Sequence, residues 1–130
     1  MIGEVGYAPI GVPQLDAHHR HLADRLTTLA RAADRGFEEP AGEGDAILAE
    51  LAEHCAREEQ MMELFAYRDR DRHVRAHAEL LESARADLES GRCGWARRLL
   101  RALARHQFTE DLLFGIALTA AQVQERRTGT

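Results

Sequence analysis

The strongest constraint in this chain is the recurrence of histidine and carboxylate residues on the apolar faces of its candidate helices. Two pairs have i,i+4 spacing, His54 with Glu58 and His73 with His77, which places both side chains of each pair on one side of a helix. His19 falls in register with leucines spaced three or four residues apart. Ionisable side chains on the core-facing stripes of several helices predict a helical bundle with a polar centre inside it.

The composition is that of one all-α domain. The 130 residues can bury a single core, and three prolines and 5% aromatic residues argue against a β-sandwich or barrel. The net charge of −5 is evenly spread and leaves no basic face for nucleic acid. No apolar run approaches the roughly 18 residues that cross a bilayer, and no export signal is visible. We therefore expect a cytoplasmic monomer that binds neither nucleic acid nor membrane.

Glycine and proline divide the single domain, residues 1–130, into an arm and four helices. Residues 1–15 are expected to form an irregular N-terminal arm, and about 16–125 the helical bundle. Asp16 can cap the first helix, and a loop is expected from Gly36 to Gly44. The expected helices are, in order, about 16–35, 45–65, 71–90 and 95–123.

Four amphipathic helices with short links most simply pack as an up-down-up-down bundle. In that topology four segments lie at the same end of the bundle. They are the start of the first helix, the end of the second, the start of the third and the later part of the fourth. Arg68 lies in the expected turn between the second and third helices. Glu58 lies ten residues before Arg68, and His77 lies nine residues after it. Both should therefore sit about 14 Å into the bundle.

Seven side chains are expected to meet at this depth: His19, His54, Glu58, His73, His77, His106 and Asp111. A lone buried histidine is more often a hydrogen-bonded core residue than a ligand. Burying this many ionisable groups without a cation is costly, however. Imidazole and carboxylate together suit first-row transition metals such as iron. The sequence therefore predicts a metal centre.

The number of donor atoms indicates two ions. Five imidazoles and two carboxylates supply nine donors, which is too many for one ion. If both carboxylates and a solvent oxygen bridge two irons, eleven of the twelve positions of two six-coordinate ions are filled. One position is then left open for a small ligand.

The same residues make the chain resemble the bacterial hemerythrins. The resemblance runs from about residue 10 to 114 and rests on four motifs: Ile10-Gly11-Val12-Pro13-Gln14-Leu15-Asp16-Ala17-His18-His19, His54-x-x-x-Glu58-Glu59, His73-x-x-x-His77 and His106-x-x-x-x-Asp111. It implies two iron ions with an oxo or hydroxo bridge. His73, His77 and His106 would bind the coordinatively full iron.

The resemblance also implies that His19 and His54 bind the second iron, with Glu58 and Asp111 bridging and O2 binding at the open position. The i,i+5 spacing of His106 and Asp111 does not suit a regular α-helix. We expect a bulge there, because π-bulges are frequent at functional sites.

Hemerythrins generally surround the open iron with bulky apolar side chains. The corresponding pocket here is expected to consist of Leu22, Cys55, Ala102, Leu103 and Gln107. Small or polar residues replace the usual phenylalanine, tryptophan and isoleucine at Cys55, Ala102 and Gln107, which predicts a roomier, more polar pocket and faster autoxidation. Each change has a simpler interpretation: Cys55 can be core packing, Phe108 can compensate for Ala102, and Gln107 can point to solvent.

Neighbouring polar residues are expected to play lesser parts. His18 and His21 fall off the leucine stripe and are expected to be solvated or to support a ligand, and Glu59 to lie on the surface. Cys55 and Cys93 are expected near opposite ends of the bundle, too far apart for a disulfide.

Two classes of function remain open. The first is a binding protein for oxygen storage, transport or sensing, with no catalytic residue assigned. The alternative is a diiron redox enzyme acting on peroxide or nitric oxide, or a repair module for iron or nitrosative stress. Ferritin-like Glu-x-x-His pairs and the zinc-protease His-Glu-x-x-His motif are absent from the sequence.

Overall fold

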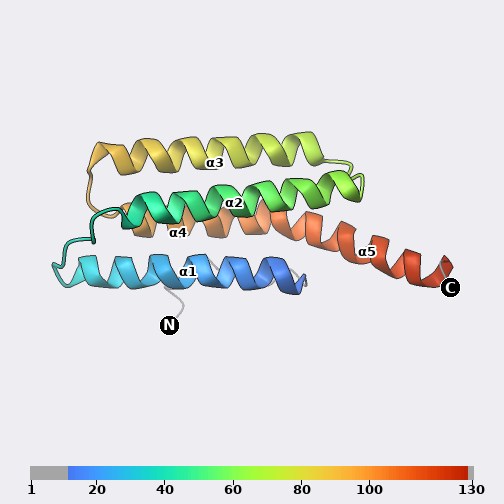
Figure 1. Ribbon diagram of the computed structural model, residues 1–130, viewed down its shortest axis with the longest axis horizontal. Coiled ribbons are helices and arrows are strands. Elements are labelled where there is room, and N and C mark those ends of the chain that lie inside the picture. The colour runs from blue at the N-terminus through green and yellow to red at the C-terminus, as the bar shows by residue number, and fades with distance from the viewer. Residues whose placement is uncertain (1–11, 129–130) are drawn as a thin grey trace.

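The computed structural model describes residues 12–128, and this part of the chain is all-helical. Its elements are α1 (Pro13–Asp34), α2 (Glu43–Leu64), α3 (Arg70–Ser90), α4 (Trp95–His106), η1 (Gln107–Asp111) and α5 (Leu112–Thr128). The π-helical turn η1 joins α4 to α5 in one continuous helix (Figure 1). The predicted all-α class is confirmed. None of the described helices has the length and apolarity needed to cross a membrane.

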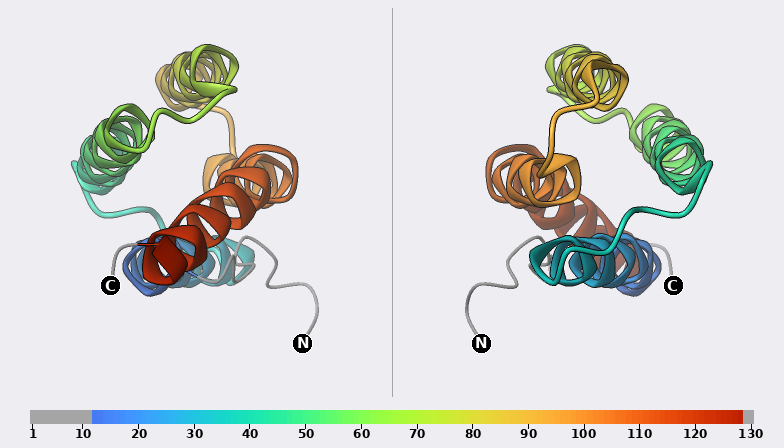
Figure 2. Two further views of the ribbon diagram at one scale, coloured as in Figure 1. Left: turned by 90° about the vertical axis from the view of Figure 1, so that its right-hand side faces the viewer. Right: turned by 90° about the vertical axis from the view of Figure 1, so that its left-hand side faces the viewer.

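The helices lie side by side, and the chain reverses direction from each long helix to the next (Figure 1). α1 contacts α2 and α4, and α3 also contacts both α2 and α4. Seen end-on, the helices stand at the corners of a four-sided arrangement (Figure 2). α5 extends beyond the N-terminal end of α1, so the continuous helix formed by α4, η1 and α5 is longer than each of the other three helices (Figure 1).

The first helix begins earlier than predicted. Pro13 is its first residue and Val12 its N-cap, so Asp16 lies in the first turn and is not the cap. Proline is favoured at this position because its fixed φ suits a helix and its missing N–H would have no helical partner. The expected arm therefore ends before residue 13, and its residues 1–11 lie outside the described part of the chain.

Apolar side chains form two core clusters. One contains residues such as Leu22, Leu51 and Leu103, and the other contains Leu15 and Phe114 with Met62 and Leu118. On α1, His19 lies between Leu15 of one cluster and Leu22 of the other, and the ligands of α2 and of the continuous helix α4–η1–α5 are flanked by the two clusters in the same way. The predicted ligands thus form a polar layer between two apolar clusters.

Candidate metal centre

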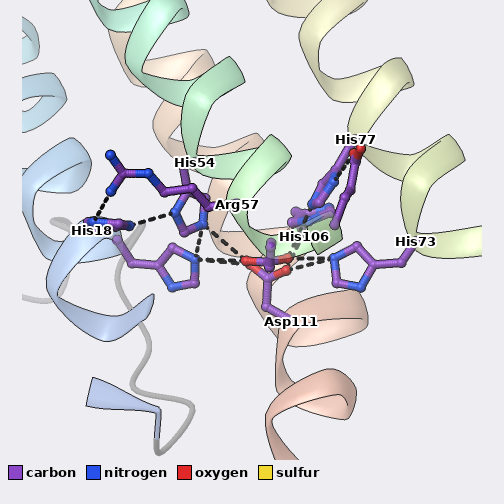
Figure 3. A network of polar contacts seen from close by, with 10 residues as sticks. His18, His54, Arg57, His73, His77, His106 and Asp111 are labelled. Carbon is purple, nitrogen blue, oxygen red and sulfur yellow. Dashed lines mark hydrogen bonds and ion pairs between the residues drawn. The ribbon is translucent and has the colours of Figure 1, made fainter. Parts of the chain in front are cut away.

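The structure brings the seven predicted ligands together in this polar layer. They come from every long helix: His19 from α1, His54 and Glu58 from α2, His73 and His77 from α3, His106 from α4, and Asp111 from η1. Six are buried, and the side chain of His106 is 9% exposed. Figure 3 shows the rings of His54, His73, His77 and His106 directed towards Asp111 in the middle of the bundle.

These residues form two donor groups that share both carboxylates. One group is His73, His77 and His106 with Glu58 and Asp111, and the other is His19 and His54 with the same two acids. Within each group one donor atom per residue can be chosen so that all lie within 4.8 Å of one another. Either group could therefore hold a metal ion.

Each carboxylate presents a different oxygen to each group. Glu58 Oε1 lies 2.8 Å from His73 Nε2, whereas Glu58 Oε2 lies 3.1 Å from His54 Nε2. Asp111 Oδ1 lies 3.0 Å from His73 Nε2, whereas Oδ2 lies 3.2 Å from His19 Nε2. Two donors at right angles around an ion, each about 2.1 Å from it, are about 3.0 Å apart. The observed spacings match this edge length in both groups.

The π-helical turn brings Asp111 into the site. In a regular α-helix the residue five positions after His106 points about 140° away from it around the helix axis. With η1 in place, Asp111 Oδ1 lies 3.0 Å from His106 Nε2. The bulge predicted from the i,i+5 spacing is confirmed, and it lies at the site where both side chains must face inward.

The buried carboxylates Glu58 and Asp111 require compensating positive charge close by. Burial lowers the pKa of His19, but hydrogen bonds to Asp111 and Glu58 outweigh it and raise the pKa to about 9. Burial also lowers the pKa of His73, but hydrogen bonds to Asp111 and Glu58 outweigh it and raise the pKa to about 9. Despite burial, hydrogen bonds from histidines hold the pKa of Glu58 well below its ordinary value, and that of Asp111 is also lowered. Protons on the imidazoles thus supply the positive charge that metal ions would otherwise bring.

Several ligand atoms also lack hydrogen-bond partners. Within the described residues, Glu58 Oε2 and His106 Nε2 are buried and make no hydrogen bond of acceptable geometry, although charged or polar atoms lie close to both. Buried polar atoms of this kind require an explanation, and a bound ion supplies one. The donor set therefore fits transition-metal ions.

The protonated imidazoles predict how the metal-free protein responds to pH. Because the pKa values of His19 and His73 are raised from 6.5 to about 9, their stabilising effect is complete below about pH 6.5 and is lost as the pH rises through 9. We expect the Tm of metal-free protein to fall by about 5 °C between pH 6.5 and 9.5. Thermal unfolding followed by circular dichroism with a chelator present measures this, and a rising Tm over that interval would contradict it.

Two residues expected at the periphery contact the ligands directly. Glu59, predicted to lie on the surface, places Oε2 2.8 Å from His77 Nδ1, and its side chain is only 30% exposed. His18 places Nδ1 3.3 Å from His54 Nδ1, which agrees with a supporting position. His21 is exposed and pairs with Glu50. Sequence reasoning missed Glu59 because it considered only the apolar stripe of α2, although position 59 is turned towards the neighbouring α3.

A small cavity adjoins the centre. Its volume is about 10 Å³, room for about one water molecule, and four of the five predicted pocket residues line it: Leu22, Cys55, Leu103 and Gln107. Leu51 and Leu80, which were not among the predicted pocket residues, also line it, and the comparison with the pocket of an oxygen carrier stays a prediction. Gln107 is 1% exposed, which excludes the solvent-facing alternative and confirms a polar group in the wall.

Ala102 is the pocket residue that does not line this cavity. Phe108 cannot compensate for it, because Phe108 is 64% exposed. Cys55 is buried and Cys93 is exposed, and both are free thiols, as the distance between their predicted positions required.

Comparisons of the chain with protein-family models, with curated proteins and with solved structures gave no match.

Proposed function

We propose that this chain is a hemerythrin-like diiron protein, built on an up-down-up-down four-helix bundle, which binds O2 at one open iron position. The observation that carries this proposal is the orientation of the two shared carboxylates. Glu58 and Asp111 each present one oxygen to the three-histidine group and the other oxygen to the two-histidine group. This is the arrangement that two carboxylate-bridged ions require.

The unequal histidine count supports an open position in one half. His73, His77 and His106 with two carboxylate oxygens and a bridging solvent oxygen complete six donors. His19 and His54 with the same bridges provide five. The half with His19 and His54 can therefore accept one further ligand, and iron bound there would supply reversible binding of O2.

The cavity supports a ligand of small size. It lies against both halves, and apart from the ligands and Gln107 its wall consists of Leu22, Leu51, Cys55, Leu80 and Leu103. A volume of about 10 Å³, room for about one water molecule, favours a ligand of a few atoms, and O2 would require these side chains to move apart. The apolar wall also keeps bulk water away from the centre.

Metal analysis combined with an optical spectrum tests the proposal. Protein reconstituted with ferrous iron under anaerobic conditions should hold two irons per chain, and exposure to O2 should produce charge-transfer bands that disappear on removal of O2. The proposed function would be refuted by a chain that holds a single ion, or by a diiron form whose optical spectrum does not change when O2 is added.

One observation favours a second function, a diiron enzyme acting on peroxide or nitric oxide. Gln107 places a buried amide in the cavity wall directly after the ligand His106, where it can donate a hydrogen bond to a small polar ligand. Such a donor assists proton delivery and redox turnover. Steady-state turnover of hydrogen peroxide or nitric oxide distinguishes this function from simple binding.

The polar wall predicts rapid autoxidation of the oxygenated protein. Replacing Gln107 with isoleucine removes the buried amide from the cavity and is expected to slow decay of the oxygenated form roughly tenfold. Stopped-flow absorption measures the decay, and Gln60→Ile on the exposed face of α2 is the matched control. A half-life of many hours in the unmodified protein would show that the buried amide does not promote oxidation.

A further inference from the structure

The outer face of α5 exposes large apolar side chains. Among the described residues 12–128, every large apolar side chain that is exposed, apart from Phe37, belongs to the end of α2, to η1 or to α5. Those on α5 are Leu113, Ile116 and Val123, which are between 46% and 59% exposed. Exposed apolar residues gathered on one element mark an interaction site more often than a solvated face.

The second half of α5 is both uncharged and unsupported. Charged residues make up 30% of the chain, but none occurs from Leu112 to Gln124. Every residue from Thr119 to Arg127 is exposed, and this part of α5 projects beyond the N-terminal end of α1 (Figure 1). A helical segment of this length without tertiary packing is only marginally stable in water. A partner that covers α5 would stabilise it.

The exposed apolar residues of α5 form one stripe, which we call the α5 stripe: Leu113, Ile116, Ala120 and Val123. Successive members are three, four and three residues apart, which is the spacing at which two helices pack as a coiled coil. A groove of about 340 Å³ adjoins the stripe, between α5 and the turn that joins α2 to α3, and Phe65 and Tyr67 form its other wall. The α5 stripe therefore has the pattern of one half of a helix–helix interface.

Antiparallel pairing with a second copy of the chain fits the side-chain sizes of the α5 stripe. If Leu113 lies opposite Val123 of the second copy, Ile116 lies opposite Ala120 of that copy, because both pairs are symmetric about position 118. A large side chain then meets a small one at both central positions. Parallel pairing would instead place Ile116 against Ile116 and leave a gap between two Ala120 side chains.

The charges at the two ends of the α5 stripe also favour antiparallel pairing. Glu110 precedes the stripe, and Arg126 and Arg127 follow it. In the antiparallel register Arg126 of one copy lies near Glu110 of the other, whereas parallel pairing brings like charges together. Glu110 already lies 3.4 Å from Arg72, so the added attraction determines the orientation of the helices more than their affinity.

A membrane surface fits α5 less well than a second copy does. Helices that lie on anionic membranes carry many Lys and Arg residues along their polar face. In α5 the cations are Arg126 and Arg127 at its end, with Glu125 beside them.

We propose that the α5 stripe is the interface of a symmetric dimer, in which the α5 helices of two copies pack antiparallel. The groove beside α5 lies at the edge of this interface and accepts apolar side chains from the projecting end of the second copy. The protein is then a dimer instead of the monomer expected from the sequence. The inference goes beyond the proposed function and is independent of the metal centre.

Sedimentation equilibrium of the full chain tests the interface. We expect a reversible monomer–dimer equilibrium, and both Val123→Asp and Ile116→Asp should weaken association at least about tenfold, because each places a charge in an apolar interface. Gln122→Asp is the matched control, since it adds the same charge to α5 away from the stripe and should leave association unchanged. Val123 and Gln122 both lie in the projecting part of α5, so neither change disturbs the bundle.

Disulfide cross-linking tests the antiparallel register. Leu113→Cys and Val123→Cys are made in a Cys93→Ser background, because Cys93 is an exposed free thiol. When the two variants are mixed and oxidised with glutathione disulfide, they should cross-link to each other. Each variant alone should not cross-link, because identical positions lie about 15 Å apart along the paired helices.

Several outcomes would overturn the inference. They are a protein that is still monomeric at about 1 mM, a dimer that neither Asp variant weakens, and cross-linking within Leu113→Cys alone. Binding of a monomer to phosphatidylglycerol vesicles, lost in Val123→Asp, would also overturn it and would make the α5 stripe a membrane-binding face. A dimer with the expected cross-link in a chain that binds no iron would uphold the inference and refute the proposed function.

Discussion

In the proposed diiron centre, replacing Glu58 with glutamine is expected to reduce the bound iron from two ions per chain to one or none. Glu58 is fully buried, and both of its oxygens lie within 3.2 Å of ligand nitrogens in different halves of the centre. A neutral amide keeps the shape of the side chain but removes the negative charge and one oxygen donor. We expect the affinity to fall at least about a hundredfold, which metal analysis after reconstitution and desalting would measure.

Glu63→Gln provides the control for this variant. Glu63 belongs to the same helix, its side chain is 75% exposed, and its nearest cation, on Arg70, is 3.9 Å away. The Glu63→Gln protein should keep both ions and the optical bands of the unmodified centre. If Glu58→Gln folds with its helical content intact and still retains two ions, the bridging role of Glu58 is wrong.

Removal of the metal is expected to lower the Tm by about 15 °C near neutral pH. Ions that bind only the folded chain stabilise it by about 4 kcal/mol when present at about a thousand times the dissociation constant. For a domain of this size each kcal/mol changes the Tm by roughly 3 to 5 °C. The layer between the two apolar clusters would also lose the cations that neutralise Glu58 and Asp111.

Thermal unfolding with and without a strong chelator measures this change. Addition of Fe2+ or Zn2+ should restore the Tm, whereas Mg2+ should not, because it binds imidazole weakly. The Glu58→Gln protein serves as a second control, since it should respond little to the chelator. Equal Tm values for the loaded and metal-free protein would show that the buried layer is stable without ions.

The sequence predicted the inward-facing residues well, because helical periodicity is a local property. The spacings of His54 with Glu58 and of His73 with His77 determine their common faces wherever the helix lies. The i,i+5 spacing of His106 and Asp111 likewise predicted a bulge, because no regular α-helix can direct both side chains to one point.

Other features could not be read from periodicity. The start of α1 depended on Pro13 at its first turn, and the capping preference of Asp16 was overridden. Glu59 belongs to the centre because α3 packs beside that face of α2. The size of the cavity depended on Leu51 and Leu80, whose packing against the pocket no spacing rule reveals.

The order of residues along each helix was thus sufficient to determine the helical class and which imidazoles and carboxylates face inward, since side-chain direction repeats every 3.6 residues, approximately. Tertiary structure alone decided how the helices are aligned. That alignment directs one oxygen of each carboxylate to each group of histidines, places Glu59 behind His77, and places Arg57 with His18 behind His54. The physical reason is that distances between helices depend on the packing of side chains from all of them at once.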